Sequence, residues 1–170
     1  MNAPHDGVGV NDPDAVWVFD VDGTLIGSIR SDRLRPGAAE LLETLSQNGT
    51  TVVVWSAGGA EYAERMLSQF GLQHHVAAYY HKETRGPDGR YLIDHLRPEH
   101  RPGTLVDDYP HEVPAHVRVI AVRQFLGGNP ADRGLQEALE IARNCGSGLR
   151  PRIPDDSRPE VAPTKCRSDR

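Results

Sequence analysis

The chain has 170 residues and a formal charge of −5, from 24 acidic and 19 basic side chains. That length allows one domain, or one domain with a tail. Its apolar runs are far shorter than the ~20 residues of a membrane-spanning helix, and no signal-peptide pattern opens it, so we expect a cytoplasmic protein. Its two cysteines, Cys145 and Cys166, exclude a disulfide framework and a four-cysteine zinc site. The acidity argues against binding nucleic acid by overall charge.

Composition divides the chain into three parts. Residues 1–13 combine Pro and Gly with few large apolar side chains, which predicts a flexible N-terminal segment. Residues 146–170 are rich in Pro and Arg and nearly free of large apolar groups, which predicts a disordered tail. Residues 14–145 are therefore expected to form the folded domain.

Within that domain, the hydrophobic pattern predicts alternating strands and helices. Short β-branched and aromatic runs are typical of buried strands, whereas apolar residues spaced three and four apart are typical of helices. In chain order we expect a strand at 16–19, a helix from Pro36 to Gly49, a strand at 51–55, a helix at 61–70, strands at 76–80, 104–106 and 117–122, and a helix at 131–144. This alternation predicts an α/β domain with a mainly parallel sheet.

Polar residues follow three of these strands. The first predicted strand is followed by Asp20 and Asp22, the second ends at Ser56, and the fourth is followed by Asp107 and Asp108. Read alone, an Asp-x-Asp-Gly sequence is a common turn, and paired aspartates after a strand commonly cap a helix. Ligands of open parallel sheets bind outside the carboxyl ends of the strands, however, so we expect these side chains to converge there.

Carboxylates that lie close together repel one another unless they share a cation or a proton. These strand ends offer only oxygen ligands, which favour a hard ion such as Mg²⁺ over zinc. The chain's eight histidines do not change this, because they show no paired-ligand spacing supported by cysteine. The sequence therefore predicts a magnesium site.

Three stretches resemble motifs of the haloacid-dehalogenase (HAD) superfamily in order and spacing. FDVDGTL at 19–25 resembles the first motif, VVVWSAGG at 52–59 the second and LVDDYP at 105–110 the fourth. The resemblance implies a three-layer Rossmann-like sandwich with a five-stranded sheet. The segment WSAGGAEYAERML is similar to phosphatases that act on the RNA-polymerase C-terminal domain (CTD), although those enzymes have Glu where this chain has Gly23.

The resemblance also implies roles for individual residues. Asp20 would be the nucleophile that forms an aspartyl-phosphate, and Asp22 the general acid and base. Mg²⁺ would be held by Asp20, the backbone carbonyl of Asp22 and Asp107, with Asp108 acting through water. The residues implied in phosphate binding are Gly23, Thr24, Ser56 and Ala57.

The third HAD motif supplies a lysine, and the best candidate is Lys82. It lies 25 residues before Asp107, and only Lys82 and Lys165 are lysines among 19 basic side chains. The alternatives are that Lys82 is a solvated loop residue, or that Arg85 takes the role.

The spacing of the motifs leaves no room for a cap domain, because 13 residues separate Gly23 from Gly37. Such an uncapped site resembles HAD members that act on macromolecular phosphates, or those that close the site by oligomerising. The short flap in this gap carries Arg30, Arg33 and Arg35, which we expect to be solvated or to face a second anionic group.

These features predict a Mg²⁺-dependent phosphomonoester hydrolase that acts through an aspartyl-phosphate. A polynucleotide 3′-phosphatase or a protein phosphatase would use the same chemistry. A non-catalytic HAD-fold binding module is the alternative of another class, and the presence of both Asp20 and Asp22 argues against it. We expect a phosphorylated partner and no membrane partner.

Overall fold

The computed structural model describes residues 15–145, so the predicted N-terminal segment at 1–13 and the predicted tail at 146–170 lie outside the described residues. The described part contains a five-stranded sheet of order β3-β2-β1-β4-β5, and all its pairings are parallel. Its strands are β1 (Val16–Phe19), β2 (Thr51–Ser56), β3 (Ala78–His81), β4 (Thr104–Asp107) and β5 (Arg118–Ala121). The predicted α/β fold with a parallel five-stranded sheet is confirmed.

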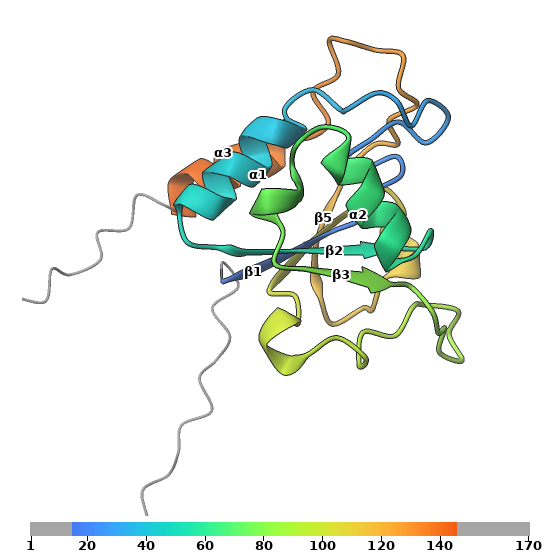
Figure 1. The fold of residues 1–170 in the computed structure, drawn as a ribbon. Coiled ribbons are helices and arrows are strands. Elements are labelled where there is room, and N and C mark those ends of the chain that lie inside the picture. Colours follow the sequence, from blue (N-terminus) through green and yellow to red (C-terminus); the bar gives the residue numbers. More distant parts are fainter. Residues whose placement is uncertain (1–14, 146–170) are drawn as a thin grey trace, which may run out of the picture.

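One face of the sheet is covered by the α-helices. Within residues 15–145 these are α1 (Ala38–Gln47), α2 (Ala60–Ser68) and α3 (Gln136–Cys145). Figure 1 shows α1 and α3 side by side, with α2 beside them on the same face. Their buried residues form one apolar cluster with alternate residues of the strands, among them Trp17 and Phe19 of β1, as the two-residue period of a strand requires.

The other face is covered by an irregular segment instead of long helices. Val18 and Trp55 point to this face and pack against Ile93, Leu96 and Val113. Between β3 and β4 the helical structure is a single 3₁₀ turn at Pro98–His100, and between β4 and β5 it is a single 3₁₀ turn at Pro110–Glu112. The segments before and after β4 thus form the third layer of the sandwich. Tyr91 from the first and Glu112 from the second line the pocket at the carboxyl edge of the sheet.

The last helix begins later than its hydrophobic pattern predicts, at Gln136 instead of residue 131. The side chain of Asn129 accepts a hydrogen bond from the Ala131 amide at 3.0 Å, and Asp132 accepts one from the Gly134 amide at 2.9 Å. Such local side-chain bonds compete with the helical pattern. Residues 129–134 therefore form turns that precede α3.

The register of the strands places the predicted site residues together. Phe19 lies opposite Val54 of β2 and Val106 of β4, so the residues that follow these strands leave the sheet at the same edge. The backbone amide of Asp20 continues the pairing with a 3.0 Å hydrogen bond to the Val106 carbonyl. No helix within residues 15–145 combines the length and the apolar character needed to cross a bilayer.

Candidate active site

Lys82 lies between two aspartates at the carboxyl edge of the sheet. Its Nζ donates to Asp20 Oδ1 at 2.7 Å and to Asp107 Oδ2 at 2.8 Å. All three residues are buried, with relative exposures of 9%, 7% and 1% for Lys82, Asp20 and Asp107. Lys82 reaches this position because its own amide, just after β3, donates to the Ser56 carbonyl at 3.0 Å. Two carboxylates and one ammonium group thus form a compact buried cluster.

Arg85, the alternative for the third motif, is engaged elsewhere. Its guanidinium lies 3.9 Å from the centre of the Tyr91 ring and pairs with Glu112 at 3.0 Å. It is exposed, and it does not line the pocket that contains the aspartates. Lys82 is therefore the candidate that the structure brings to the carboxylates.

The carboxylates form a cradle suited to a cation. Asp20, Asp107 and Asp108 each offer one oxygen within 4.8 Å of the others. Asp108 Oδ2 is buried and has no hydrogen-bond partner. Oxygens on opposite sides of Mg²⁺ lie ~4 Å apart, since each Mg–O bond is ~2.0–2.1 Å. An all-oxygen donor set of this size, with one orphaned carboxylate oxygen, fits Mg²⁺.

Electrostatics favour the uptake of a cation at this position. Burial raises the pKa of Asp20 from 3.8 to about 7; Lys82 acts against this shift and Asp107 adds to it. Burial, followed by the charge of Asp107, raises the pKa of Asp108 to about 6. Burial disfavours the charged form of Lys82, but its two carboxylate partners outweigh that effect and raise its pKa. The site therefore combines a permanent ammonium with carboxyl groups that a further positive charge would help to ionise.

Asp22 lies apart from the lysine cluster. Its Oδ1 accepts a 2.7 Å hydrogen bond from the Tyr62 hydroxyl. Burial, followed by the hydrogen bond to Asp22, raises the pKa of Tyr62 above its usual 10, so the hydroxyl stays a donor.

The lysine cluster and Asp22 line the same pocket, which has a volume of about 280 Å³. The residues that line it are Asp20, Asp22, Ala57, Lys82, Tyr91, Asp107, Asp108, Tyr109 and Glu112.

Of the predicted phosphate-binding residues, one lines the pocket and the others lie outside its lining. Ala57 lines the pocket. Ser56 is buried outside the pocket lining, and its Oγ accepts a hydrogen bond from the Gly58 amide at 3.1 Å. The side chain of Thr24 is fully buried and bonds Asp108, so a role of Thr24 in phosphate binding stays a prediction. Its hydroxyl donates to Asp108 Oδ1 at 3.3 Å and accepts from the Asp108 amide at 3.1 Å, and so holds Asp108 in place.

Gly23 permits the close approach of Asp108. Its φ of +88° belongs to the left-handed region that glycine adopts at low cost. A Cβ atom at this position would lie 2.4 Å from Asp108 Oδ2. The glycine therefore serves the carboxylate cluster in addition to turning the chain after β1.

Arg35 requires a correction. We expected the flap arginines to be solvated or to face an anion, but Arg35 is 1% exposed. It donates to Asp132 at 2.6 Å, to the Arg123 carbonyl at 2.6 Å, and to the carbonyls of Gly23 and Thr24 at 3.2 Å each. Arg35 is thus an internal clamp that joins the flap, the turn after β1 and the segment before α3.

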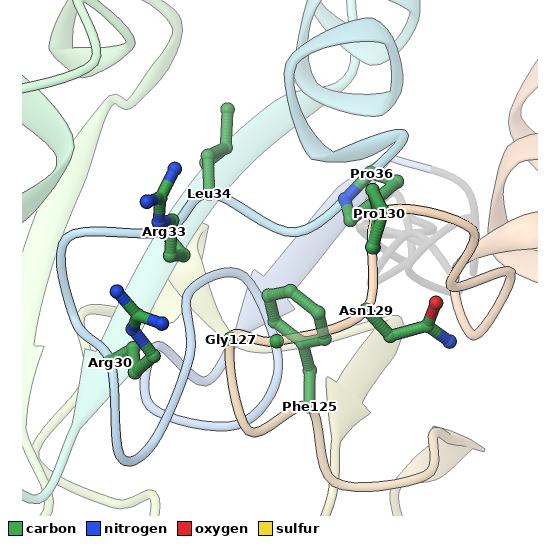
Figure 2. Close-up of a pocket in the computed structure, with 9 residues that line it drawn as sticks. Arg30, Arg33, Leu34, Pro36, Phe125, Gly127, Asn129 and Pro130 are labelled. Carbon is green, nitrogen blue, oxygen red and sulfur yellow. The ribbon is translucent and has the colours of Figure 1, made fainter.

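The other two flap arginines remain at the surface. Arg30 and Arg33 lie on one side of a second pocket of about 390 Å³, with the ring of Phe125 at its centre and Pro36 and Pro130 on the other side (Figure 2). None of the predicted catalytic or metal-binding residues lines this pocket. It is a separate feature of the surface beside the flap.

Sequence reasoning did not identify Tyr62 as a site residue. The tyrosine lies in the first turn of α2, six positions after Ser56, within the segment that resembles the CTD phosphatases. That resemblance was the available signal. The hydrogen bond to Asp22, which is 40 residues away in sequence, could only be found in the folded chain.

The parallel α/β sheet brings the aspartates that follow β1 together with those at the end of β4, and Lys82 lies between Asp20 and Asp107. This is the arrangement that the resemblance to the HAD superfamily implies. A comparison with protein families matches residues 15–150 to the family described as "NIF: NLI interacting factor-like phosphatase". The chain belongs to this family, a HAD-superfamily family related to the CTD phosphatases. A comparison with curated proteins finds no match.

Proposed function

We propose that this phosphatase is a Mg²⁺-dependent phosphomonoester hydrolase with Asp20 as its nucleophile. The observation that carries the proposal is the position of Asp20, whose Oδ1 lies 2.7 Å from Lys82 Nζ at an open pocket. Asp107 and Asp108 each offer a carboxylate oxygen within 4.8 Å of one from Asp20. A nucleophile, a fixed positive charge and oxygen ligands for a cation therefore meet in one place.

In the first step, a carboxylate oxygen of Asp20 attacks phosphorus and forms an O–P bond. The bond from phosphorus to the substrate oxygen breaks, and that oxygen takes its electron pair together with a proton from Asp22. In the second step, Asp22 takes a proton from water while the water oxygen attacks phosphorus. The bond to Asp20 then breaks, which releases inorganic phosphate and restores both aspartates.

Lys82 acts on the charge of the transferring phosphoryl group. Its ammonium is buried and already fixed by Asp20 and Asp107, so it needs little rearrangement to stabilise added negative charge. When bound by Asp20, Asp107, Asp108 and the Asp22 carbonyl, Mg²⁺ would offset the repulsion between the anionic nucleophile and the anionic phosphate.

The open site supports a large substrate. Between β1 and α1 the chain makes only the short flap, which is closed by a bridge between Ile26 and Leu34. A phosphate on a protein or another macromolecule can reach a pocket that no domain within residues 15–145 covers. We therefore propose macromolecular phosphomonoesters as the substrates.

The direct test is hydrolysis of a generic aryl phosphate. We expect activity with Mg²⁺, its loss in EDTA and recovery on adding Mg²⁺. Asp20→Asn should lower kcat by about 10³-fold or more, since loss of a covalent nucleophile is among the largest single-residue effects. Asp94→Asn, at an exposed position outside the pocket, is the matched control. An inert wild type, or an Asp20→Asn variant as active as the control, would contradict the proposal.

Two further measurements address the intermediate and the substrate. Acid-quenched wild type should carry a phosphoryl group that hydroxylamine removes, as an acyl phosphate does, and Asp20→Asn should carry none. Comparison of phosphopeptides, 3′-phosphorylated oligonucleotides and sugar phosphates then separates the substrate classes by kcat/KM. A preference for free sugar phosphates would contradict a macromolecular substrate.

A further inference from the structure

We infer that Tyr62 is a positioning residue that orients the Asp22 carboxyl group for proton transfer. The inference rests on the proposed function, in which Asp22 is the general acid and base. The Tyr62 hydroxyl donates to Asp22 Oδ1 at 2.7 Å. Asp22 lines the pocket, whereas Tyr62 is outside its lining and reaches the site through this bond.

The arrangement gives the two oxygens of Asp22 different surroundings. Oδ1 is occupied by the Tyr62 hydroxyl, so Oδ2 is the oxygen left to carry the proton that goes to the substrate. The ammonium of Lys82 is directed to Asp20 and Asp107, and therefore does not hold Asp22. Tyr62 thus fixes one carboxylate oxygen of Asp22 by a hydrogen bond, as Lys82 does for Asp20.

The position of Tyr62 is itself fixed by the loop after β2. A Cβ atom at Gly58 would lie 2.4 Å from Cδ1 and 2.8 Å from Cε1 of Tyr62, so the ring rests on bare glycine backbone. The same loop is held by the hydrogen bond from the Gly58 amide to Ser56 Oγ. Arg65, one turn later in α2, lies 5.7 Å from the centre of the ring. A residue packed in this way can hold its partner in one orientation.

An oriented acid matters most for substrates with a poor leaving group. An alkoxide must receive its proton as the P–O bond breaks, whereas a nitrophenolate is stable enough to leave with little help. Loss of the Tyr62 hydroxyl should therefore affect alkyl phosphates much more than activated aryl phosphates. A residue that only stabilises the fold would affect both equally.

The test is Tyr62→Phe, measured as kcat/KM across phosphate esters of graded leaving-group pKa. We expect the variant to lose about tenfold or more on alkyl phosphates and to show a steeper leaving-group dependence than the wild type. Tyr79→Phe is the matched control, because the Tyr79 hydroxyl is buried in β3 without a hydrogen-bond partner. It should reproduce the wild-type dependence. An unchanged dependence in Tyr62→Phe would overturn the inference.

A double-mutant cycle with Asp22→Asn separates positioning from general damage. If Tyr62 acts through Asp22, Tyr62→Phe should add little to the loss already caused by Asp22→Asn. Equal losses in both backgrounds would overturn the inference while leaving the proposed function intact. Failure of the proposed function is seen separately, as an inert wild type or an Asp20→Asn variant with full activity.

Discussion

Lys82 places its positive charge between Asp20 and Asp107. The pKa of the Asp20 carboxyl is raised to about 7, and burial is the main cause. The contacts with Lys82 act against this rise. The lysine therefore has two effects in the proposed reaction. It stabilises charge on the phosphoryl group, and it helps to keep the nucleophile ionised.

Lys82→Ala should lower kcat by about 10²-fold or more, because the fixed charge at the phosphoryl group is lost. Removing the favourable charge beside Asp20 also raises the pKa of that carboxyl. The acidic limb of the pH–rate profile should therefore move to higher pH. Steady-state kinetics across pH tests both effects. Arg85→Ala is the control; a loss in that variant as large as in Lys82→Ala would return the third-motif role to Arg85.

Asp132 should make the fold sensitive to acid. Burial raises its pKa, but the hydrogen bonds from Arg35 and the Gly134 amide outweigh burial and hold the pKa below 3.8. The stabilisation is thus present above the unfolded value of 3.8 and is lost as the pH falls through the folded value. Asp132→Asn should lower the free energy of unfolding by about 3 kcal/mol at pH 7. The difference from the wild type should shrink as the pH falls and Asp132 of the wild type becomes protonated.

Urea unfolding of the wild type and of Asp132→Asn, between neutral and acidic pH, measures this difference in the free energy of unfolding. Asp32→Asn is the control, because Asp32 pairs with Arg33 at 3.7 Å and its side chain is 67% exposed. The exposed pair should contribute less than about 1 kcal/mol. Equal effects of the two substitutions would contradict the role of Arg35 as a buried clamp.

Residues within one motif were predictable, whereas contacts between distant segments were not. Asp20, Asp107 and Lys82 could be found because each follows a strand whose apolar run is visible in the sequence. Arg35 could not be distinguished from Arg30 and Arg33, since its partners Arg123 and Asp132 lie 88 and 97 residues further along the chain.

At the scale of elements, the turn after β1 couples backbone geometry to the carboxylate cluster. Gly23→Ala should destabilise the protein by about 1 kcal/mol or more through its positive φ. Its Cβ would also displace Asp108, whose Oδ2 lies 2.4 Å from that position. The Mg²⁺ concentration for half-maximal activity should therefore rise.

Gly89→Ala separates these two effects. Gly89 has a φ of +78°, but no atom lies within 4 Å of the position that a Cβ would occupy, so the substitution carries the backbone cost without the clash. Thermal unfolding should show a lower stability in both variants. In a Mg²⁺ titration, the concentration for half-maximal activity should rise only in Gly23→Ala. A shift of the same size in both would contradict the link between Gly23 and Asp108.

The elements themselves were largely predictable from periodicity. Each strand was expected within two residues of its observed bounds, because buried strands have short and continuous apolar runs. The start of α3 was placed five residues early. Periodicity records which residues face the core, but it does not show that Asn129 and Asp132 bond their own backbone and delay the helix.

At the scale of the whole molecule, the described core is self-contained. Both faces of the sheet are covered by side chains from within residues 15–145. We therefore expect a chain of residues 14–145 to unfold cooperatively, with a free energy of unfolding within about 0.5 kcal/mol of the full chain. Urea unfolding and aryl phosphate hydrolysis test this expectation. A fragment that folds but lacks activity would show that the remaining residues contribute to the site.

The burial of Arg35 has a consequence for the rate of turnover. Lifting the flap would remove its guanidinium from Asp132 and from the carbonyls of Gly23, Thr24 and Arg123. Buried hydrogen bonds from a charged donor stabilise a protein by about 1.5–3 kcal/mol each, so opening the flap would carry a large free-energy cost. We therefore expect the flap to stay against the turn that carries Asp22 during turnover, so that the proposed reaction requires no opening of the flap.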